Sequence, residues 1–312
     1  MGKTPNKKII YIGNFSIHFT TENHIKKSFE ALGWEVDIIQ EDKMTEATIP
    51  EILAKQNDYD FLLYTRTWAR TGRLYKMLLN QIKIKTVSFH LDLYIGLTRG
   101  KQLQNDSFFQ SDYVFSADCG HQKEFKAMGI NHIGLSPAVL HESCYLGEKK
   151  WDYDVIFVGS ETYHTEWKYR PFLINWLRQT YGVRFQMLPN KDFNCIRGDD
   201  LNKLYNSAKV IVGDSTYSPH YWSDRIPETL GRGGFLIHPY TDGLEKEFDL
   251  YKDLVPYNYG DMDQLKMIID YYLDHDDERE AIRLHGMETV KNKHTYLNKV
   301  QFILDYLGYA KN

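Results

Sequence analysis

The sequence has few cysteines, no long apolar run and no excess of positive charge. Three cysteines stand among 312 residues, Cys119, Cys144 and Cys195, and no two have the C-x-x-C spacing of a zinc or redox site. Scattered thiols in odd number are typical of reduced cysteines, so we expect neither a disulfide framework nor a bound metal. No apolar stretch reaches the roughly 18 residues of a transmembrane helix, and no signal peptide follows the first lysines. These absences predict a cytoplasmic protein without a membrane-spanning segment.

The charge balance makes one class of partner improbable. The formal net charge is -4, whereas non-specific binding to nucleic acid depends on a basic surface. We therefore expect nucleic acid only as an acceptor of a modification, although a local basic patch remains compatible with this balance. A hydrophobic content of 42% and a charged content of 26% are ordinary for a globular protein. The 23 tyrosines and six tryptophans suit stacking on sugars, and equally suit aromatic cores and interfaces.

Two halves of the chain repeat one plan of strands joined through helices. An apolar strand at residues 7–13 is followed by a loop, a helix and a second strand, and a new series begins at residue 154. Strands connected in this way form parallel sheets. The first loop lacks G-x-G-x-x-G, which excludes a dinucleotide fingerprint. We expect domains at 1–145 and 151–285, a linker around 141–152, and a C-terminal segment 286–312 with one long helix over 288–306.

Two features of the C-terminal part have a structural explanation. The apolar positions between Leu265 and Leu273 recur at helical spacing, so they predict packing against a core. The acidic run from Asp274 to Glu280 is typical of a solvated helix boundary. His294 is expected to make a structural contact.

The segment over residues 223–248, SDRIPETLGRGGFLIHPYTDGLEKEF, combines several binding features. Ser223 or Asp224 can cap a short helix that ends near residues 231–234, and FLIHP then predicts a buried strand. A helix start offers unpaired N–H groups and a positive dipole, which suit a phosphate. Arg225 adds a bidentate phosphate donor, and Glu228 can accept hydrogen bonds from sugar hydroxyls.

The pattern R-x-x-E-T-L-G-R-G-G-F-L-I, followed by Gly-Leu-Glu, resembles the donor-binding segment of GT-B glycosyltransferases. Within the "glycosyl transferases group 1" set it is most similar to the CgeB-like group. The resemblance implies two Rossmann-like domains whose parallel sheets face a cleft, with a final helix that crosses back to the first domain. It also implies that Glu228 binds the donor ribose and that Gly233 and Gly234 let the backbone approach the donor. The wider family has a second glutamate seven residues before Glu228, where this chain has Tyr221, which we group with the donor-binding residues.

Further donor-binding residues are expected at strand ends of the second domain. Gly159 and Ser160 end the strand DVIFVGS, and Ser215 follows the strand KVIVGDS. The resemblance places Arg170 against the donor diphosphate; the alternative is an arginine at a helix start that pairs with a surface carboxylate.

Aromatic residues precede the segment over residues 223–248. Tyr217, Tyr221 and Trp222 can enclose a nucleobase or a sugar ring, or can fill a domain interface.

The first domain supplies the candidates for the acceptor side. His18 lies in the loop after the first strand, where ligands bind in open α/β sheets; the alternative for His18 is a hydrogen bond to the loop backbone. Gly13, at the end of the same strand, is grouped with the donor-binding residues. Asp92 can polarise a sugar hydroxyl or orient His90, or it can cap the next turn. Arg66 and Arg70 follow a strand end and can meet phosphate or solvent.

The sequence thus predicts a glycosyltransferase, a hexosyltransferase that uses a nucleotide sugar such as UDP-glucose. We expect His18, Asp92 and Arg225 at the catalytic centre. By resemblance, transfer retains anomeric configuration and needs no metal ion; no cofactor is expected, because the nucleotide sugar is a co-substrate. Polysaccharide, protein and modified phage DNA are candidate acceptors. The alternatives are a GT-B sugar-nucleotide epimerase and a non-catalytic nucleotide-binding protein on the same fold.

Overall fold

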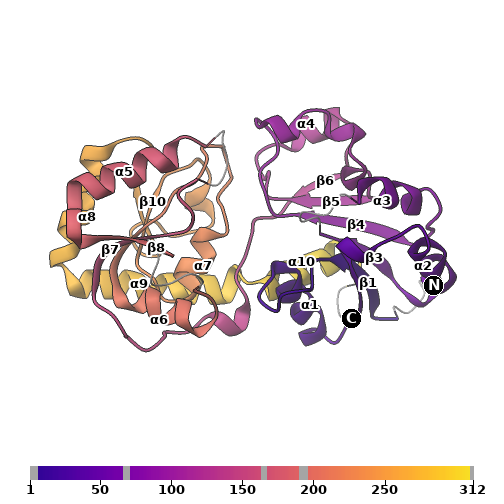
Figure 1. Ribbon diagram of the computed structural model, residues 1–312, viewed down its shortest axis with the longest axis horizontal. Helices are drawn as coiled ribbons and strands as arrows, with labels where there is room; N and C mark the ends of the chain where they lie inside the picture. Colours follow the sequence, from indigo (N-terminus) through magenta and orange to yellow (C-terminus); the bar gives the residue numbers. More distant parts are fainter. Residues whose placement is uncertain (1–5, 66–70, 163–166, 190–195, 310–312) are drawn as a thin grey trace. The chain divides into compact units, whose positions relative to one another are not determined.

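The computed structural model describes residues 6–65, 71–162, 167–189 and 196–309, and it divides into two compact units (Figure 1). Unit 1 comprises Met1–Ser136 and Tyr296–Asn312, and unit 2 comprises Pro137–Thr295. Arg66, Arg70 and Cys195 lie outside the described residues.

Unit 1 is built on a parallel sheet of six strands in the order β2-β1-β3-β4-β5-β6. The strands are short and apolar, and in β1 every residue after the first is buried. Such continuous burial is typical of parallel strands that are covered on both faces. The elements are β1 Lys8–Gly13, α1 Thr21–Ala31, β2 Glu35–Gln40, α2 Thr48–Lys55, β3 Phe61–Tyr64, α3 Gly72–Leu79, β4 Lys85–His90, β5 Tyr113–Ser116, α4 Gln122–Ala127, β6 His132–Gly134 and α10 Tyr296–Tyr306.

Unit 2 is built on a parallel sheet of five strands in the order β11-β10-β9-β7-β8. Its elements are β7 Tyr153–Val158, α5 Tyr169–Tyr181, β8 Phe185–Leu188, α6 Asp199–Ser207, β9 Ala208–Val212, α7 Arg225–Gly231, β10 Leu236–Pro239, β11 Val255–Tyr257, α8 Met262–Asp274 and α9 Asp276–Lys293. Successive strand residues face opposite layers: Ile156 packs with α6 and α7, and Phe157 packs with α5 and α8. Leu265, Ile269 and Leu273 of α8 are buried in the second layer, which confirms the predicted core stripe.

Both sheets have the same topological switch point. In each unit the chain runs from the first strand outward to the second, then returns past the first to the third. The connections therefore leave in opposite directions on the two sides of the first strand, at β1/β3 in unit 1 and at β7/β9 in unit 2. Ligands of open α/β sheets bind outside the carboxyl ends of the strands at such a point.

The long helix predicted over residues 288–306 is wrong, because two helices cover this stretch. Helix α9 ends at Lys293 and α10 begins at Tyr296, where the chain passes from unit 2 to unit 1. The His294 ring stacks on Phe248 with 4.5 Å between ring centroids, and its carbonyl accepts a 3.2 Å hydrogen bond from the Val139 amide. These contacts stabilise the interruption between α9 and α10, and they confirm the structural contact expected of His294. Helix α10 packs on α1, as Figure 1 shows, so the final helix does return to the first unit.

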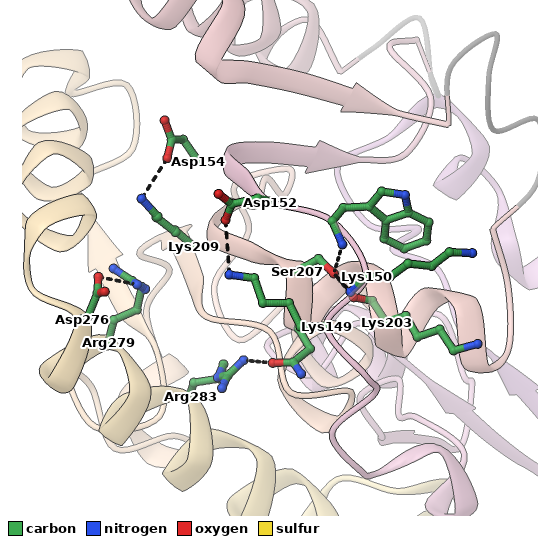
Figure 2. A network of polar contacts seen from close by, with 12 residues as sticks. Lys149, Lys150, Asp152, Asp154, Lys203, Ser207, Lys209, Asp276, Arg279 and Arg283 are labelled. Atoms are coloured by element: carbon green, nitrogen blue, oxygen red, sulfur yellow. Dashed lines mark hydrogen bonds and ion pairs between the residues drawn. The ribbon is translucent and has the colours of Figure 1, made fainter.

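The linker predicted around residues 141–152 belongs instead to unit 2, which begins at Pro137. This segment is attached by hydrogen bonds: the Lys150 and Trp151 amides donate to the Ser207 hydroxyl at 2.9 and 3.0 Å. Figure 2 shows the surrounding network, in which Lys149 reaches Asp152 at 3.2 Å. The polar composition of this segment suggested a linker. Its backbone amides instead donate hydrogen bonds to α6, which attaches the segment to unit 2.

Candidate functional site

A carboxylate between two arginines lies at the switch point of unit 2. Asp214 follows β9, Arg170 lies in the first turn of α5, and Arg225 begins α7. The Arg170 Nε atom donates to Asp214 Oδ2 at 2.7 Å, and Arg225 Nε lies 3.3 Å from Asp214 Oδ1. The structure therefore brings together two predicted arginines, and it adds an aspartate that the sequence did not single out. We call these three residues the arginine cluster.

The arginine cluster is nearly shielded from water. The side chains of Arg170, Asp214 and Arg225 are 7%, 4% and 11% exposed. The guanidinium carbon of Arg225 lies 4.5 Å from the centroid of the Phe157 ring, a cation–π distance. Two guanidinium groups thus flank the carboxylate of Asp214. Such a site favours an anionic group with several oxygen acceptors, because arginine binds phosphate oxygens in a bidentate manner.

Gly159 and Ser160 complete the wall of the cluster through their backbone. Gly159 has φ +140°, and a Cβ atom there would lie 2.9 Å from Nη2 of Arg225. Only glycine combines this backbone conformation with room for the guanidinium. Ser160 is exposed, and its carbonyl accepts from Arg170 Nη1 at 3.2 Å. Ser215 is buried and its hydroxyl donates to the Thr216 carbonyl at 3.2 Å, which turns it toward the backbone.

Glu228 is held by an arginine that the sequence analysis missed. Arg232 Nε donates to Glu228 Oε2 at 2.6 Å, and Arg232 Nη1 donates to Asn202 Oδ1 at 2.6 Å. The Glu228 side chain keeps 21% exposure. The spacing of four residues on a helix could have revealed this pair. Binding of ribose by Glu228 stays a prediction.

The predicted capping of α7 is wrong. Asp224 precedes the helix with φ -53° and ψ -18°, and no side-chain hydrogen bond caps it. Its backbone is already helical, whereas a capping side chain needs an extended residue to fold back on the first turn.

Gly233 and Gly234 have a packing explanation. Gly233 has φ +76°, and a Cβ atom there would lie 2.3 Å from Leu146 Cδ2; one at Gly234 would lie 2.5 Å from Ile211 Cδ1. Without a Cβ atom, both glycines allow the backbone after α7 to pack against the side chains of Leu146 and Ile211. The approach of a donor to either glycine stays a prediction.

The aromatic residues before α7 separate into two kinds. Tyr221 and Trp222 are 2% and 4% exposed, and Trp222 packs in the core of unit 2. Tyr217 is 50% exposed. Burial within unit 2 does not favour a stacking role for Tyr221, whose contact with a donor stays a prediction.

The three candidates of unit 1 lie at two strand ends. Gly13 ends β1 and His18 is exposed in the loop that follows, with its ring 5.0 Å from that of Phe19. Asp92 follows β4 and accepts from Arg99 Nη1 at 3.1 Å. The nearby His90 has its Nε2 atom 3.0 Å from the Phe108 carbonyl oxygen. Asp92 therefore pairs with Arg99, and its catalytic role stays a prediction.

A buried carboxyl group at the switch point of unit 1 escaped the sequence analysis. Glu22, in the first turn of α1, is 2% exposed, and burial raises its pKa to about 7. A Cβ atom on Gly13 would lie 2.7 Å from Glu22 Cγ, so glycine makes room for this side chain. Tyr11, beneath it, hydrogen-bonds to Thr65 at 2.9 Å.

Comparisons with known proteins connect this architecture to glycosyltransferases. The model of the glycosyl transferase-like family matches residues 154–305, which contain the arginine cluster and Glu228. No curated protein matches the sequence. Among solved structures, HepE from Anabaena, in complex with UDP and glucose, has a TM-score of 0.65 at 13% identity and covers 96% of this chain and 99% of its own.

Two further structures give the same fold. A glycosyltransferase from Rickettsia africae has a TM-score of 0.65 at 14% identity, covering 96% of this chain and 97% of its own. Sucrose-phosphate synthase from Thermosynechococcus elongatus has a TM-score of 0.64 at 11% identity, covering 97% and 100%. The chain has the fold of the GT-B glycosyltransferases, with two parallel-sheet α/β domains, and the similarity of fold extends over nearly its whole length.

No helix in the described ranges is both long and apolar enough to cross a membrane. Within those same ranges, no group of three or more histidine, cysteine, aspartate or glutamate side chains is placed to hold a metal ion.

Proposed function

We propose that this protein is a glycosyltransferase that takes a sugar from a nucleoside diphosphate sugar, with UDP-glucose the favoured donor. The single observation that carries the proposal is the arginine cluster, two shielded cations around one carboxylate at the switch point of unit 2. The family match over residues 154–305 and the UDP complex of HepE support a nucleoside diphosphate as the anion.

The chemistry follows from charge. Departure of a nucleoside diphosphate places negative charge on the bridging oxygen, and fixed guanidinium groups out of water stabilise that charge strongly. Arg170 and Arg225 are the donors, and Asp214 holds both in place. Glu228, with 21% exposure beside Arg232, supplies an acceptor for ribose hydroxyls. In this proposal His18 and Asp92 of unit 1 face the acceptor.

The finer assignment follows the sequence resemblance. We propose a CgeB-like enzyme of the cytoplasm that transfers with retention and without a metal ion. Chelation by EDTA should therefore leave turnover unchanged, and NMR of the product should show the anomeric configuration of the donor.

The first experiment measures binding of UDP, GDP, CDP and ADP by thermal shift and calorimetry. A ligand that binds only the folded protein raises its melting temperature. We expect UDP to do so, and Arg225→Gln to weaken its binding by about tenfold or more, because charge-assisted hydrogen bonds are lost.

Arg73→Gln is the matched control, because Arg73 is an exposed arginine of unit 1 paired with Glu46 at 2.8 Å. This variant should bind UDP like the wild type. Absence of binding by all four nucleotides, or equal binding by the Arg225→Gln variant, would reject the proposal.

A further inference from the structure

A group of four aromatic rings, three of them exposed, lies beside the arginine cluster. We call Tyr169, Phe172, Tyr217 and Tyr259 the aromatic ledge. The rings of Tyr169 and Tyr259 are stacked with centroids 4.3 Å apart, and Tyr217 meets Tyr259 edge to face at 5.9 Å. Phe172 borders Tyr169 at 6.3 Å. Four rings from three separate chain segments therefore form one continuous aromatic surface.

The ledge and the arginine cluster share one edge of the sheet. Tyr169 precedes Arg170 in the first turn of α5, Tyr217 follows Asp214 after β9, and Tyr259 follows the end of β11. Strands β9 and β11 are parallel, so their carboxyl ends lie at the same edge. The charge of Asp214 contributes, after burial and Tyr169, to raising the pKa of Tyr259 to about 12, which also indicates proximity.

The ledge is attached to a buried tyrosine outside it, and three of its own rings are exposed. The Tyr169 hydroxyl bonds to that of Tyr257 at 2.8 Å, and Tyr257 is 1% exposed. In contrast, Phe172, Tyr217 and Tyr259 are 53%, 50% and 37% exposed. Core packing explains Tyr257 but leaves the outer rings unexplained. A contiguous exposed aromatic surface commonly marks a binding site.

We propose that the aromatic ledge is the stacking surface for the nucleobase of the nucleoside diphosphate; this inference rests on the proposed function. Its ligand has a charged diphosphate at one end and a flat π system at the other, which matches a cationic cluster beside exposed rings. Stacking of a base on tyrosine needs no particular hydrogen-bond pattern. Tyr217 is the most exposed tyrosine of the ledge, at 50%, and is the residue on which stacking of the base should depend most.

The test separates the two ends of the ligand. Calorimetry is used to measure the affinity of UDP and of inorganic pyrophosphate for the wild type, Tyr217→Leu and Tyr217→Phe. Pyrophosphate has no base, so it reports on the arginine cluster and on the integrity of the fold. Tyr306→Leu is the matched control, because Tyr306 is a 49% exposed tyrosine of α10 in unit 1.

The expected result is a loss of UDP affinity of about fivefold or more in Tyr217→Leu, the lower end of what stacking contributes. Pyrophosphate affinity should stay within about twofold, and Tyr217→Phe and Tyr306→Leu should bind UDP like the wild type. Unchanged UDP affinity in Tyr217→Leu would overturn the inference, as would an equal loss of UDP and pyrophosphate. A wild type that binds neither nucleotides nor pyrophosphate would instead overturn the proposed function.

Discussion

Asp214 is the residue on which the arrangement of the arginine cluster depends. It is 3% exposed, and its two oxygens face two different arginines at 2.7 and 3.3 Å. Neither arginine could stay in this shielded place without a counter-charge, because removing one partner of a buried ion pair is strongly destabilising. Asp214 is therefore a positioning residue of the proposed site.

The variant Asp214→Asn tests this role. We expect the free energy of unfolding to fall by about 3 kcal/mol, because two buried guanidinium groups lose the carboxylate charge between them. Urea denaturation measures the loss, with the exposed Asp263→Asn as control. Pyrophosphate should stabilise the variant more than the wild type, since it replaces the missing charge. A variant of wild-type stability would contradict the role.

The raised pKa of Glu22 predicts that the stability of the protein depends on pH. Its pKa is about 7 in the folded protein and the ordinary value is 4.5, so the folded state binds more protons between these values. Its contribution to stability is therefore fully present below pH of about 4.5 and is lost as the pH rises through about 7. Glu22→Gln keeps a neutral amide in place and should remove this part of the pH dependence.

The measurement is the free energy of unfolding between pH 5 and 8, by urea, for wild type and Glu22→Gln. The variant should gain relative stability as the pH rises, by up to about 3 kcal/mol. Glu30→Gln, an exposed glutamate on the same helix, is the control and should show no such trend. A difference between wild type and Glu22→Gln that is independent of pH would contradict the assignment.

At the scale of elements, the two switch points have the same topology but different ionisable groups. In unit 1 the loop after β1 and the start of α1 enclose the carboxyl group of Glu22. In unit 2 the loop after β7 and the start of α5 present Arg170, with Arg225 added from α7. An anionic group therefore meets guanidinium donors at the second place and a buried carboxyl group at the first, which supports assigning the donor to unit 2.

Most elements could be predicted because strands and helices leave local patterns. The apolar runs of β1, β7 and β10 and the stripe of α8 are visible in the sequence, and the structure has them there. Asp214 was missed because its arginine partners lie on other elements of the chain. Arg232 was missed although it stands four residues after Glu228, a spacing that pairs side chains on a helix. The ledge joins residues that lie between 3 and 90 positions apart, so no local pattern reveals it.

Gly233 tests how α7 ends. Alanine there must adopt φ +76° and place its Cβ 2.3 Å from Leu146, so Gly233→Ala should lower the free energy of unfolding by about 2 kcal/mol. Adding Leu146→Ala removes the clash but not the backbone strain, so the double variant should lose less than the sum of the two single losses. Exact additivity in urea denaturation would show that Leu146 does not limit this position.

At the scale of the whole molecule, the chain passes between the two units at two points. The chain leaves unit 1 after Ser136 and returns to it after Thr295. Within unit 2, Val139 and Thr295 pair as an isolated bridge, so the outgoing and returning chains lie side by side. Within unit 1, the Lys299 ammonium donates to the Ser136 hydroxyl at 2.9 Å. The sequence pattern over residues 288–306 looks helical throughout and does not reveal this break. The contacts that interrupt the helix are tertiary, so no local pattern could predict them.

This division predicts that donor affinity and turnover can be changed separately. The arginine cluster and the ledge belong to unit 2, whereas His18 and Asp92 belong to unit 1. His18→Ala and Asp92→Asn should therefore leave the UDP dissociation constant within about twofold of the wild-type value. The same variants should lower turnover of UDP-glucose by about tenfold or more, because each removes a group that is proposed to act on the reacting atoms. Arg225→Gln should weaken UDP binding and lower turnover together. Calorimetry and the rate of UDP release measure the two quantities. His18→Ala with unchanged turnover would remove that residue from the catalytic centre, and a loss of UDP affinity in either unit 1 variant would show that donor binding is not confined to unit 2.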